Sequence, residues 1–296
     1  MSYVRPFDPW RATSLCTCPF KYTVNPYTGC AHRCLYCYAS SYIRDFFNPR
    51  PKEGFPRVLA RDLKQAPEGS IINVSSSSDP YQPLELEYGY TRLLLEMAVG
   101  RYVVEVVTKS DLVARDADLL AKGPSVVSIT ITTLDANLAS RLEPGAPAPG
   151  RRVEAVRRLS EAGVPVVVRL DPLIPGLNDA PKSMREVLEA AAAAGAKHVV
   201  ASTYKAKPDS LRRLTAAFPE IIPKLRELYV EGGERIHGYL YAARGWRFKA
   251  LSEAREIAHE LGLTFAVCRE GFPQLIDTGI SCDGTHLASL YNGARR

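Results

Sequence analysis

The chain alternates short hydrophobic runs, rich in β-branched residues, with longer segments in which hydrophobic residues recur at helical spacing. The short runs predict strands at residues 21–24, 70–75, 102–108, 126–132, 164–170 and 197–202. The last four runs are almost continuously hydrophobic, which is typical of strands in a parallel sheet covered on both faces. The pattern therefore indicates an α/β fold.

The longer segments predict helices at residues 38–46, 56–65, 85–98, 111–121, 151–162 and 181–194. Several of them are followed by a glycine, where helices commonly stop: Gly100, Gly123, Gly163 and Gly195. Strands and helices thus alternate as repeated βα units. Because crossovers between parallel strands are right-handed, the carboxyl ends of the strands meet at one edge, where barrel enzymes build their sites.

Polar residues follow the predicted strands at this edge. They are residues 75–79 after the second strand, Thr108, Lys109 and Ser110 at the third, Thr130 and Thr132 at the fourth, and Arg169 and Asp171 at the fifth. We expect these side chains to converge on one mouth of the fold. The alternative role for serine, threonine and aspartate after strands is in turns and helix caps.

Cys30, Cys34 and Cys37 lie close together in C-x3-C-x2-C spacing after the first predicted strand. Thiolates are soft ligands that select iron–sulfur clusters or zinc over hard cations. Three thiolates leave one iron of a [4Fe–4S] cluster open to a small molecule, so the spacing indicates a catalytic cluster. The alternative is a zinc site or three unrelated core cysteines, but no second cysteine or histidine pair follows at ordinary zinc-site spacing.

The same segment resembles the signature of the radical S-adenosylmethionine (SAM) superfamily, including the aromatic Tyr36 before the last cysteine. The resemblance implies that Cys30, Cys34 and Cys37 bind the cluster, that the open iron binds SAM, and that Tyr36 lies against the adenine. In the superfamily, an electron from the cluster cleaves SAM to a 5'-deoxyadenosyl radical that abstracts hydrogen from the substrate. We expect His32 to be a neighbour of the cluster with no catalytic role.

Further segments resemble spore photoproduct lyases and their uncharacterised relatives. These segments are residues 25–30, 75–83, 107–110 and 142–145, with Arg151 and Arg152, and they fall within residues 16–180. The resemblance implies SAM contacts from Ser76, Ser77, Ser78, Asp79, Lys109, Ser110, Thr130, Thr132, Arg152 and Arg169. It also places the proline-rich loop between Glu143 and Arg152 beside the SAM pocket. A salt bridge that pins this loop is the alternative.

The resemblance does not extend to the lyase reaction. Where the lyase carries a cysteine thought to return a hydrogen atom to its product, this chain has Ser76. A serine O–H bond is far too strong to donate a hydrogen atom as a thiol does. We therefore assign no residue to act on the substrate, and we leave the reaction type, lyase or transferase, open.

Six βα units suit the partial (β/α)6 TIM-like barrel of radical SAM enzymes. We expect this barrel over residues 20–235, after an N-terminal extension over residues 1–19. Residues 236–296 are expected to form a C-terminal extension with a helix at 249–261 and a strand at 263–267. This extension would pack against the barrel as a lid or as part of a second metal site.

Four cysteines lie outside the signature: Cys16, Cys18, Cys268 and Cys282. Chain ends often lie close together, so these residues can gather into one site. Four thiolates suit a second [4Fe–4S] cluster or a tetrahedral zinc, with His286 as a substitute ligand. Reduced structural cysteines are the remaining interpretation.

Charge and hydropathy limit the partners. No run of 18 residues is continuously hydrophobic and residues 1–10 lack a signal core, so we expect a cytoplasmic protein with no membrane partner. The net charge of +6 is compatible with a nucleic-acid substrate, modified or repaired at carbon, if basic residues gather on one face. The candidate groups are Arg141, Arg151, Arg152, Arg157 and Arg158; Arg212, Arg213, Lys224 and Arg226; and Arg244, Arg247 and Lys249.

The sequence leaves two alternatives to a radical SAM enzyme that acts on nucleic acid. The same radical would act equally on a protein, a peptide or a small metabolite. A non-catalytic iron–sulfur or zinc-binding protein is the alternative from a different class. For the radical reaction we expect an electron donor such as a ferredoxin or a flavodoxin.

Overall fold

The computed structural model describes residues 2–7 and 15–289, and its main sheet has eight strands in the order β1, β2, β5, β6, β7, β8, β9, β12. Their bounds are Arg5–Phe7 for β1, Lys21–Val24 for β2, Ile71–Val74 for β5, Val103–Thr108 for β6, Ser125–Thr130 for β7, Val166–Leu173 for β8, His198–Thr203 for β9 and Thr264–Val267 for β12. Two small sheets pair β3 (Tyr27–Thr28) with β4 (Arg50–Pro51) and β10 (Glu234–Ile236) with β11 (Tyr239–Tyr241).

The strands from β2 to β12 run parallel, and β1 runs antiparallel to β2. All six predicted strands are present, and they lie side by side in their order along the chain. The sheet ends at β1 on one side and at β12 on the other, so the barrel is partial. The predicted α/β class and the partial barrel are confirmed.

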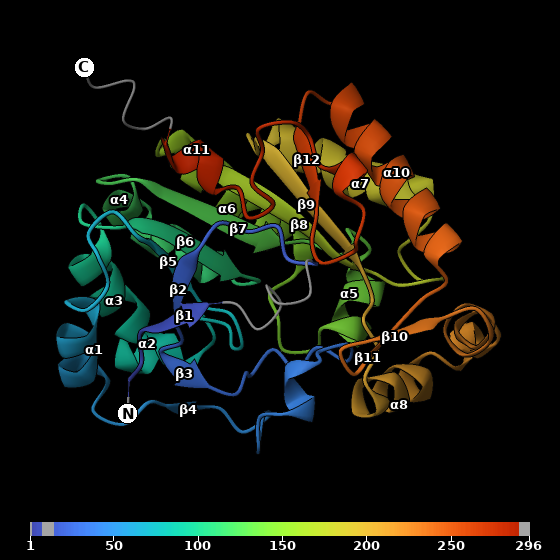
Figure 1. Ribbon diagram of the computed structural model, residues 1–296, viewed down its shortest axis with the longest axis horizontal. Helices are drawn as coiled ribbons and strands as arrows, with labels where there is room; N and C mark the ends of the chain where they lie inside the picture. The colour runs from blue at the N-terminus through green and yellow to red at the C-terminus, as the bar shows by residue number, and fades with distance from the viewer. Residues whose placement is uncertain (1, 8–14, 290–296) are drawn as a thin grey trace.

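Helices connect successive strands, and most of the long ones lie on one side of the curved sheet (Figure 1). The α-helices are α1 (Phe55–Leu63), α2 (Leu84–Tyr88), α3 (Tyr90–Ala98), α4 (Ala117–Leu120), α5 (Ala136–Leu142), α6 (Pro149–Glu161), α7 (Pro181–Ala193), α8 (Pro208–Ala217), α9 (Ile222–Leu225), α10 (Arg244–Glu260) and α11 (Thr285–Ser289). Shorter helical turns occupy Ala39–Ser41, Asp111–Asp116, Pro219–Ile221, Arg226–Glu231 and Pro273–Leu275.

Three predicted helices differ in the structure, and the one at residues 111–121 divides into the helical turn Asp111–Asp116 and the short α4. The segment at residues 85–98 forms two helices, α2 and α3, because Gly89 between them has a left-handed φ of +62°. The helix predicted at residues 38–46 is wrong, since this segment contains only the turn Ala39–Ser41. Asp45 has a φ of +51°, and the Ser40 hydroxyl donates to Asp209 of α8, 2.7 Å away, so tertiary contacts hold the segment out of a helix.

The region from residue 236 on completes the barrel. The predicted strand at 263–267 is β12, which pairs in parallel with β9. Phe265 and Val267 of β12 are buried in the main hydrophobic core, and α10 packs against α7, β9 and β12. This region therefore supplies the last strand and the last outer helix of the fold. The lid remains a prediction.

The two faces of the sheet differ in chemistry because side chains alternate along each strand. Outward-facing residues such as Val104 and Val166 join the main hydrophobic core beneath the helices. The inner face carries polar side chains, including Lys21, Asn73 and Arg169, which line a cavity. The outer helices thus cover one face of the sheet, and the cavity lies on the other.

The C-terminal segment packs on this inner face. Leu287 of α11 lies in a small hydrophobic cluster with Val126, Val167 and Val200, which come from β7, β8 and β9. Among the described residues, no helix combines the length and the hydrophobicity needed to cross a membrane.

Candidate active site

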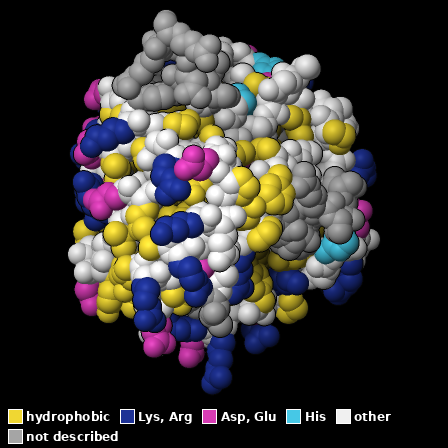
Figure 2. Space-filling model, turned by 60° about the vertical axis from the view of Figure 1, so that its left-hand side comes forward, with side chains coloured by type: hydrophobic (Ala, Val, Ile, Leu, Met, Phe, Trp, Pro, Cys, Tyr) yellow, Lys and Arg dark blue, Asp and Glu magenta, His cyan; other side chains and the backbone are white. Residues whose placement is uncertain are grey.

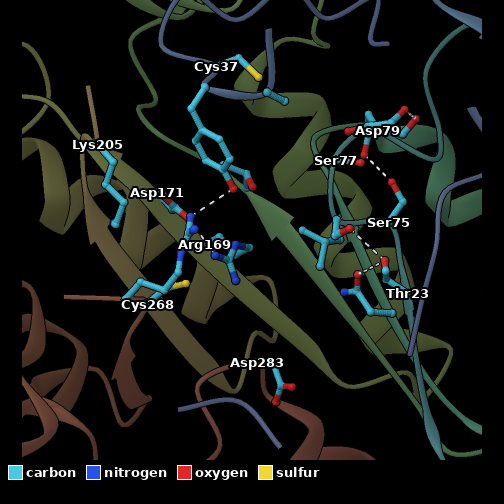
Figure 3. Close-up of a pocket in the computed structure, with 18 of the residues that line it drawn as sticks. Thr23, Cys37, Ser75, Ser77, Asp79, Arg169, Asp171, Lys205, Cys268 and Asp283 are labelled. Atoms are coloured by element: carbon cyan, nitrogen blue, oxygen red, sulfur yellow. Dashed lines mark hydrogen bonds and ion pairs between the residues drawn. The ribbon is translucent and has the colours of Figure 1, made fainter. Parts of the chain in front are cut away.

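A cavity of about 980 Å³ lies between the inner face of the sheet, the loop that carries Cys30 and the C-terminal segment. All seven cysteines of the chain line it: Cys16, Cys18, Cys30, Cys34, Cys37, Cys268 and Cys282. Figure 3 shows Ser75, Ser77 and Asp79 on one side of the cavity, and Asp171, Lys205 and Cys268 on the other. The strand-end residues predicted to converge on one mouth therefore do so in large part.

The loop with the three signature cysteines is fixed by backbone contacts. The amide of Cys30 donates to the carbonyl of Phe46 at 2.8 Å, and that of Leu35 to the carbonyl of Leu142 at 2.9 Å. Gly145 allows a second segment to approach the loop, since a Cβ at this position would lie 2.1 Å from the carbonyl oxygen of Ala31. The loop is thus held against two separate parts of the chain.

The three thiols of this loop are free and lie out of bulk water. Burial raises the pKa of Cys30 and of Cys37, and it raises the pKa of Cys34 to about 12. The thiols are therefore neutral at pH 7 in the metal-free chain. A metal that binds them has to displace their protons.

The serine segment after β5 is tied to the cysteine loop. Asn25 accepts hydrogen bonds from the amides of Ser76, at 3.1 Å, and Ser77, at 2.9 Å. The Ser78 hydroxyl donates to the carbonyl of Gly29, 2.8 Å away and directly before Cys30. Ser76, Ser77 and Ser78 all line the cavity. The structure thus brings this predicted segment beside the predicted cluster site.

Asp79 joins two strand ends. It accepts hydrogen bonds from the Thr108 hydroxyl at 2.7 Å and from the Lys109 amide at 2.8 Å. Its other neighbour is His32, whose Nδ1 lies 3.3 Å from an Asp79 oxygen. Burial would raise the pKa of Asp79, but His32 and these hydrogen bonds outweigh it and lower that pKa to about 2. Asp79 is therefore ionised and holds the cysteine loop, through His32, to the end of β6.

Lys109 and Tyr36 face each other at the cavity wall, where the Lys109 ammonium lies 5.4 Å from the centre of the Tyr36 ring. The Tyr36 hydroxyl donates to the buried carboxylate of Glu143. Glu143 also accepts from the Thr132 hydroxyl at 3.1 Å and pairs with Arg152 at 2.5 Å. A network behind the cavity wall thus orients Tyr36.

Three predicted SAM contacts do not line the cavity. Thr132 and Arg152 bind Glu143 behind the wall, and Arg152 also donates to the carbonyl of Pro147 in the proline-rich loop at 2.8 Å. Ser110 caps the helical turn that follows it, by accepting from the amide of Leu112 at 3.3 Å. The alternatives weighed from the sequence describe two of these residues: Arg152 forms the loop-pinning salt bridge and Ser110 the helix cap. Thr130 and Arg169 do line the cavity.

Two cations on the far wall, Lys205 and Arg269, were not predicted from the sequence, whereas Arg169 and Asp171 beside them were. Lys205, just after β9, pairs with Glu270 at 2.7 Å, and Arg269 donates to the Tyr38 hydroxyl at 3.1 Å. Arg169 pairs with Asp171 at 2.7 Å. The rule that strand ends carry function would have found Lys205, because it follows the sixth predicted strand. Nothing in the local sequence signals Arg269.

The floor of the cavity is a buried ion network. The Lys21 ammonium lies 2.6 Å from a Glu105 oxygen and 2.7 Å from an Asp283 oxygen. Asn73 donates to the same Glu105 oxygen at 2.9 Å. Burial raises the pKa of Glu105 to about 7 although Lys21 acts in the opposite direction. In the sequence, Lys21, Asn73 and Glu105 are polar residues within three otherwise hydrophobic predicted strands. This pattern could have identified the network.

The four cysteines outside the signature loop all line this cavity, as the second-site prediction requires. The sulfur of Cys18 lies 3.0 Å from that of Cys282, and the two are not joined by a disulfide. Cys16 and Cys268 line the same cavity. His286, the predicted substitute ligand, lies outside the cavity lining, where it packs edge-on against His198 with ring centres 5.1 Å apart.

Many of the candidate basic residues are paired within the chain. Arg151 pairs with Asp111 at 2.7 Å and Arg213 with Asp209 at 2.9 Å, while Arg247 is buried against Glu270 at 3.1 Å. Figure 2 shows one face, on which Lys and Arg side chains gather in the lower half among hydrophobic side chains.

Comparison with known proteins agrees with this geometry. An uncharacterised protein of Methanocaldococcus jannaschii is 35% identical over 164 residues, which cover 54% of this chain and 62% of that protein. An uncharacterised protein of Mycobacterium tuberculosis is 29% identical over 235 residues, covering 72% of this chain and 68% of that protein. A solved spore photoproduct lyase, complexed with dinucleoside spore photoproduct, has a similar fold with a TM-score of 0.65 and 18% identity, over 83% of this chain and 76% of the lyase.

The match to a family model covers more than half of the chain. Residues 24–191 match the model of the radical SAM superfamily. This range begins at the end of β2, contains the cysteine loop and extends through β8 into α7. The chain belongs to the radical SAM superfamily of enzymes.

Proposed function

We propose that Cys30, Cys34 and Cys37 hold a [4Fe–4S] cluster and that SAM binds beside it, so that radical chemistry takes place on a substrate in the cavity. The observation that carries the proposal is the position of three free thiols of one loop on the wall of a cavity of about 980 Å³. Membership in the superfamily implies the cluster and SAM. When bound, they supply a 5'-deoxyadenosyl radical that abstracts hydrogen from the substrate.

The donor set fits a cluster better than a single metal ion. A zinc ion needs four donors at about 2.0–2.3 Å from one centre. Within residues 2–7 and 15–289, no three cysteine, histidine, aspartate or glutamate side chains are grouped so that they could hold one ion. In a [4Fe–4S] cube each cysteine binds a different iron, so the thiolates are spaced more widely. This favours the cluster over the zinc alternative.

Lys109 is placed to bind the carboxylate of SAM. Its ammonium lines the cavity next to the Tyr36 ring and has no ion-pair partner in the described part of the chain. A cation taken out of water without a partner is unfavourable, and an anionic ligand offsets this. The position of Lys109 between β6 and the cysteine loop therefore supports a carboxylate site at this point.

Most of the other SAM contacts come from the same side of the cavity. We infer that Tyr36, oriented by Glu143, lies against the adenine. Ser76, Ser77 and Ser78 offer hydroxyls, and Asp79 holds their segment in place. Thr130 adds to the polar lining, and Arg169 reaches the cavity from the opposite wall. These residues bind and orient SAM, and the C-terminal segment that covers the cavity keeps bulk water away from the reacting atoms.

Anaerobic reconstitution tests this function. The chain is loaded with iron and sulfide, reduced with dithionite and given SAM, and 5'-deoxyadenosine is measured by chromatography. We expect 5'-deoxyadenosine from the native chain and from the exposed-site control Ser140→Ala, and none from Cys37→Ala. A native chain that holds an intact cluster and forms no 5'-deoxyadenosine overturns the proposal.

We also propose that the substrate is a nucleic acid. Three cations on the far wall, Arg169, Lys205 and Arg269, line the cavity beside the proposed SAM site. The spore photoproduct lyase of similar fold is solved with a dinucleoside photoproduct, which motivates the same class of substrate for this chain. A ferredoxin or a flavodoxin is the proposed source of the electron.

Retention on immobilised DNA and RNA tests the substrate class. Binding through phosphates weakens steeply with salt, so we expect retention at low salt that falls by about ten-fold or more between 50 and 200 mM salt. Retention that is absent at low salt, while SAM cleavage persists, overturns the nucleic-acid proposal and favours a peptide or a small metabolite.

A further inference from the structure

The structure places a second group of thiols on the cavity, apart from the signature loop. Cys16 and Cys18 come from the segment before β2, Cys268 follows β12, and Cys282 lies in the loop before α11. The sulfurs of Cys18 and Cys282 are 3.0 Å apart although 264 positions separate them in the sequence. Three segments of the chain thus deliver free thiols to one region.

Specific contacts hold these segments in place. The Lys21 ammonium, three residues after Cys18, pairs with Asp283, the residue after Cys282, at 2.7 Å in a buried site. Gly284 lies so close to β8 that a Cβ on it would be 2.2 Å from a methyl carbon of Val167. Pairing of β12 with β9 fixes the backbone at Cys268, whose amide donates to the carbonyl of Ala201 at 3.0 Å. The meeting of the thiols therefore follows from the packing of the barrel itself.

The surroundings suit a negatively charged thiolate centre. Lys21 and Arg169 line the cavity with these cysteines, and both are removed from bulk water. A cluster ligated by thiolates carries net negative charge, which buried cations stabilise. Both cations also pair with carboxylates, so they offset only part of the charge of a cluster.

We propose that Cys16, Cys18, Cys268 and Cys282 bind a second iron–sulfur cluster, across the cavity from the signature loop. Four thiolates occupy all four irons of a [4Fe–4S] cube, which leaves no open iron and makes this a closed centre. Zinc held by the same four thiolates is the alternative, and metal analysis separates the two. The proposal does not rest on SAM cleavage, because it concerns a different set of ligands.

Metal analysis of cysteine variants tests the second cluster. The triple variant Cys30→Ala/Cys34→Ala/Cys37→Ala removes the signature ligands and is reconstituted anaerobically with iron and sulfide. We expect it to lose SAM cleavage and to keep about four irons per chain, roughly half of the native content, with a cluster signal in electron paramagnetic resonance after reduction. The quadruple variant Cys16→Ala/Cys18→Ala/Cys268→Ala/Cys282→Ala is expected to keep the other half.

The control is Thr278→Ala, an exposed change in the same C-terminal segment, which is expected to keep the full iron content. Circular dichroism establishes that each variant is folded. Where the quadruple variant does not fold, the single variant Cys268→Ser serves, with an altered resonance signal as the expected result. A folded triple variant that binds no iron, or that holds only zinc, overturns the second cluster and leaves the proposed function standing.

Discussion

Gly284 lies against Val167, and a Cβ built on Gly284 would be only 2.2 Å from a methyl carbon of that valine. Gly284 also has a left-handed φ of +77°. The C-terminal loop can therefore enter the inner side of the sheet only with glycine at this position. Its entry brings Asp283 to Lys21 and Cys282 to Cys18.

We predict that Gly284→Ala destabilises the fold. The added methyl group overlaps Val167 and the backbone becomes strained, so the free energy of unfolding falls by about 2–4 kcal/mol. Gly279→Ala is the matched control, because Gly279 has a φ of +75° and no atom within 4 Å of a Cβ. Its expected loss is about 1–2 kcal/mol, from backbone strain alone. Equal losses in urea unfolding of the two variants would contradict the role given to Val167.

Replacement of Lys109 is expected to weaken SAM binding. Lys109→Met removes a charge-assisted contact of about 1.5–3 kcal/mol, so the Kd for SAM rises roughly 10- to 100-fold, as measured by calorimetry on the reconstituted chain. Lys122→Met, at an exposed position, is the control and leaves the Kd unchanged. An unchanged Kd for Lys109→Met would remove Lys109 from the SAM site, provided that its iron content equals that of the native chain.

Arg152 is predicted to act through folding and the orientation of Tyr36. Arg152→Met leaves the buried Glu143 carboxylate without its ion pair, and the free energy of unfolding falls by about 3–5 kcal/mol. Arg157→Met breaks an exposed pair with Glu154 on the same helix and changes stability by less than about 1 kcal/mol. The double variant Arg152→Met/Glu143→Gln should recover part of the loss in thermal unfolding. No recovery would show that the ion pair is not the cause.

Glu105 is expected to make stability depend on pH. Its folded pKa is about 7, raised above the usual value by burial, so the folded state holds a proton that the unfolded state releases. The contribution of Glu105 to the free energy of unfolding is therefore complete below about pH 4.5 and is lost as the pH rises through 7. Glu105→Gln should flatten the fall in stability between pH 5 and pH 7.5 in urea titrations, whereas the exposed control Glu68→Gln should not. A native chain whose stability rises over this range would contradict the assignment.

The sequence predicted those features that depend on neighbours in the chain. Strand β2 occupies the predicted residues 21–24, because alternation and β-branched composition act over a few positions. The C-x3-C-x2-C spacing indicated the superfamily in the same way, since one short loop supplies the cysteines. The break at Gly89 and the missing helix at residues 38–46 show the limit: a left-handed residue and a contact with Asp209 overrode local periodicity.

The tertiary structure decided which distant residues share a site. Thr132 and Arg152, both predicted as SAM contacts, bind Glu143 and lie outside the cavity lining. No local sequence pattern predicts the contact between Cys18 and Cys282, because the two residues are 264 positions apart. It depends on β12 joining the sheet and on Gly284 fitting against Val167. The sequence by itself determined the cysteine loop and the strands, and packing between remote segments decided what faces the loop across the cavity.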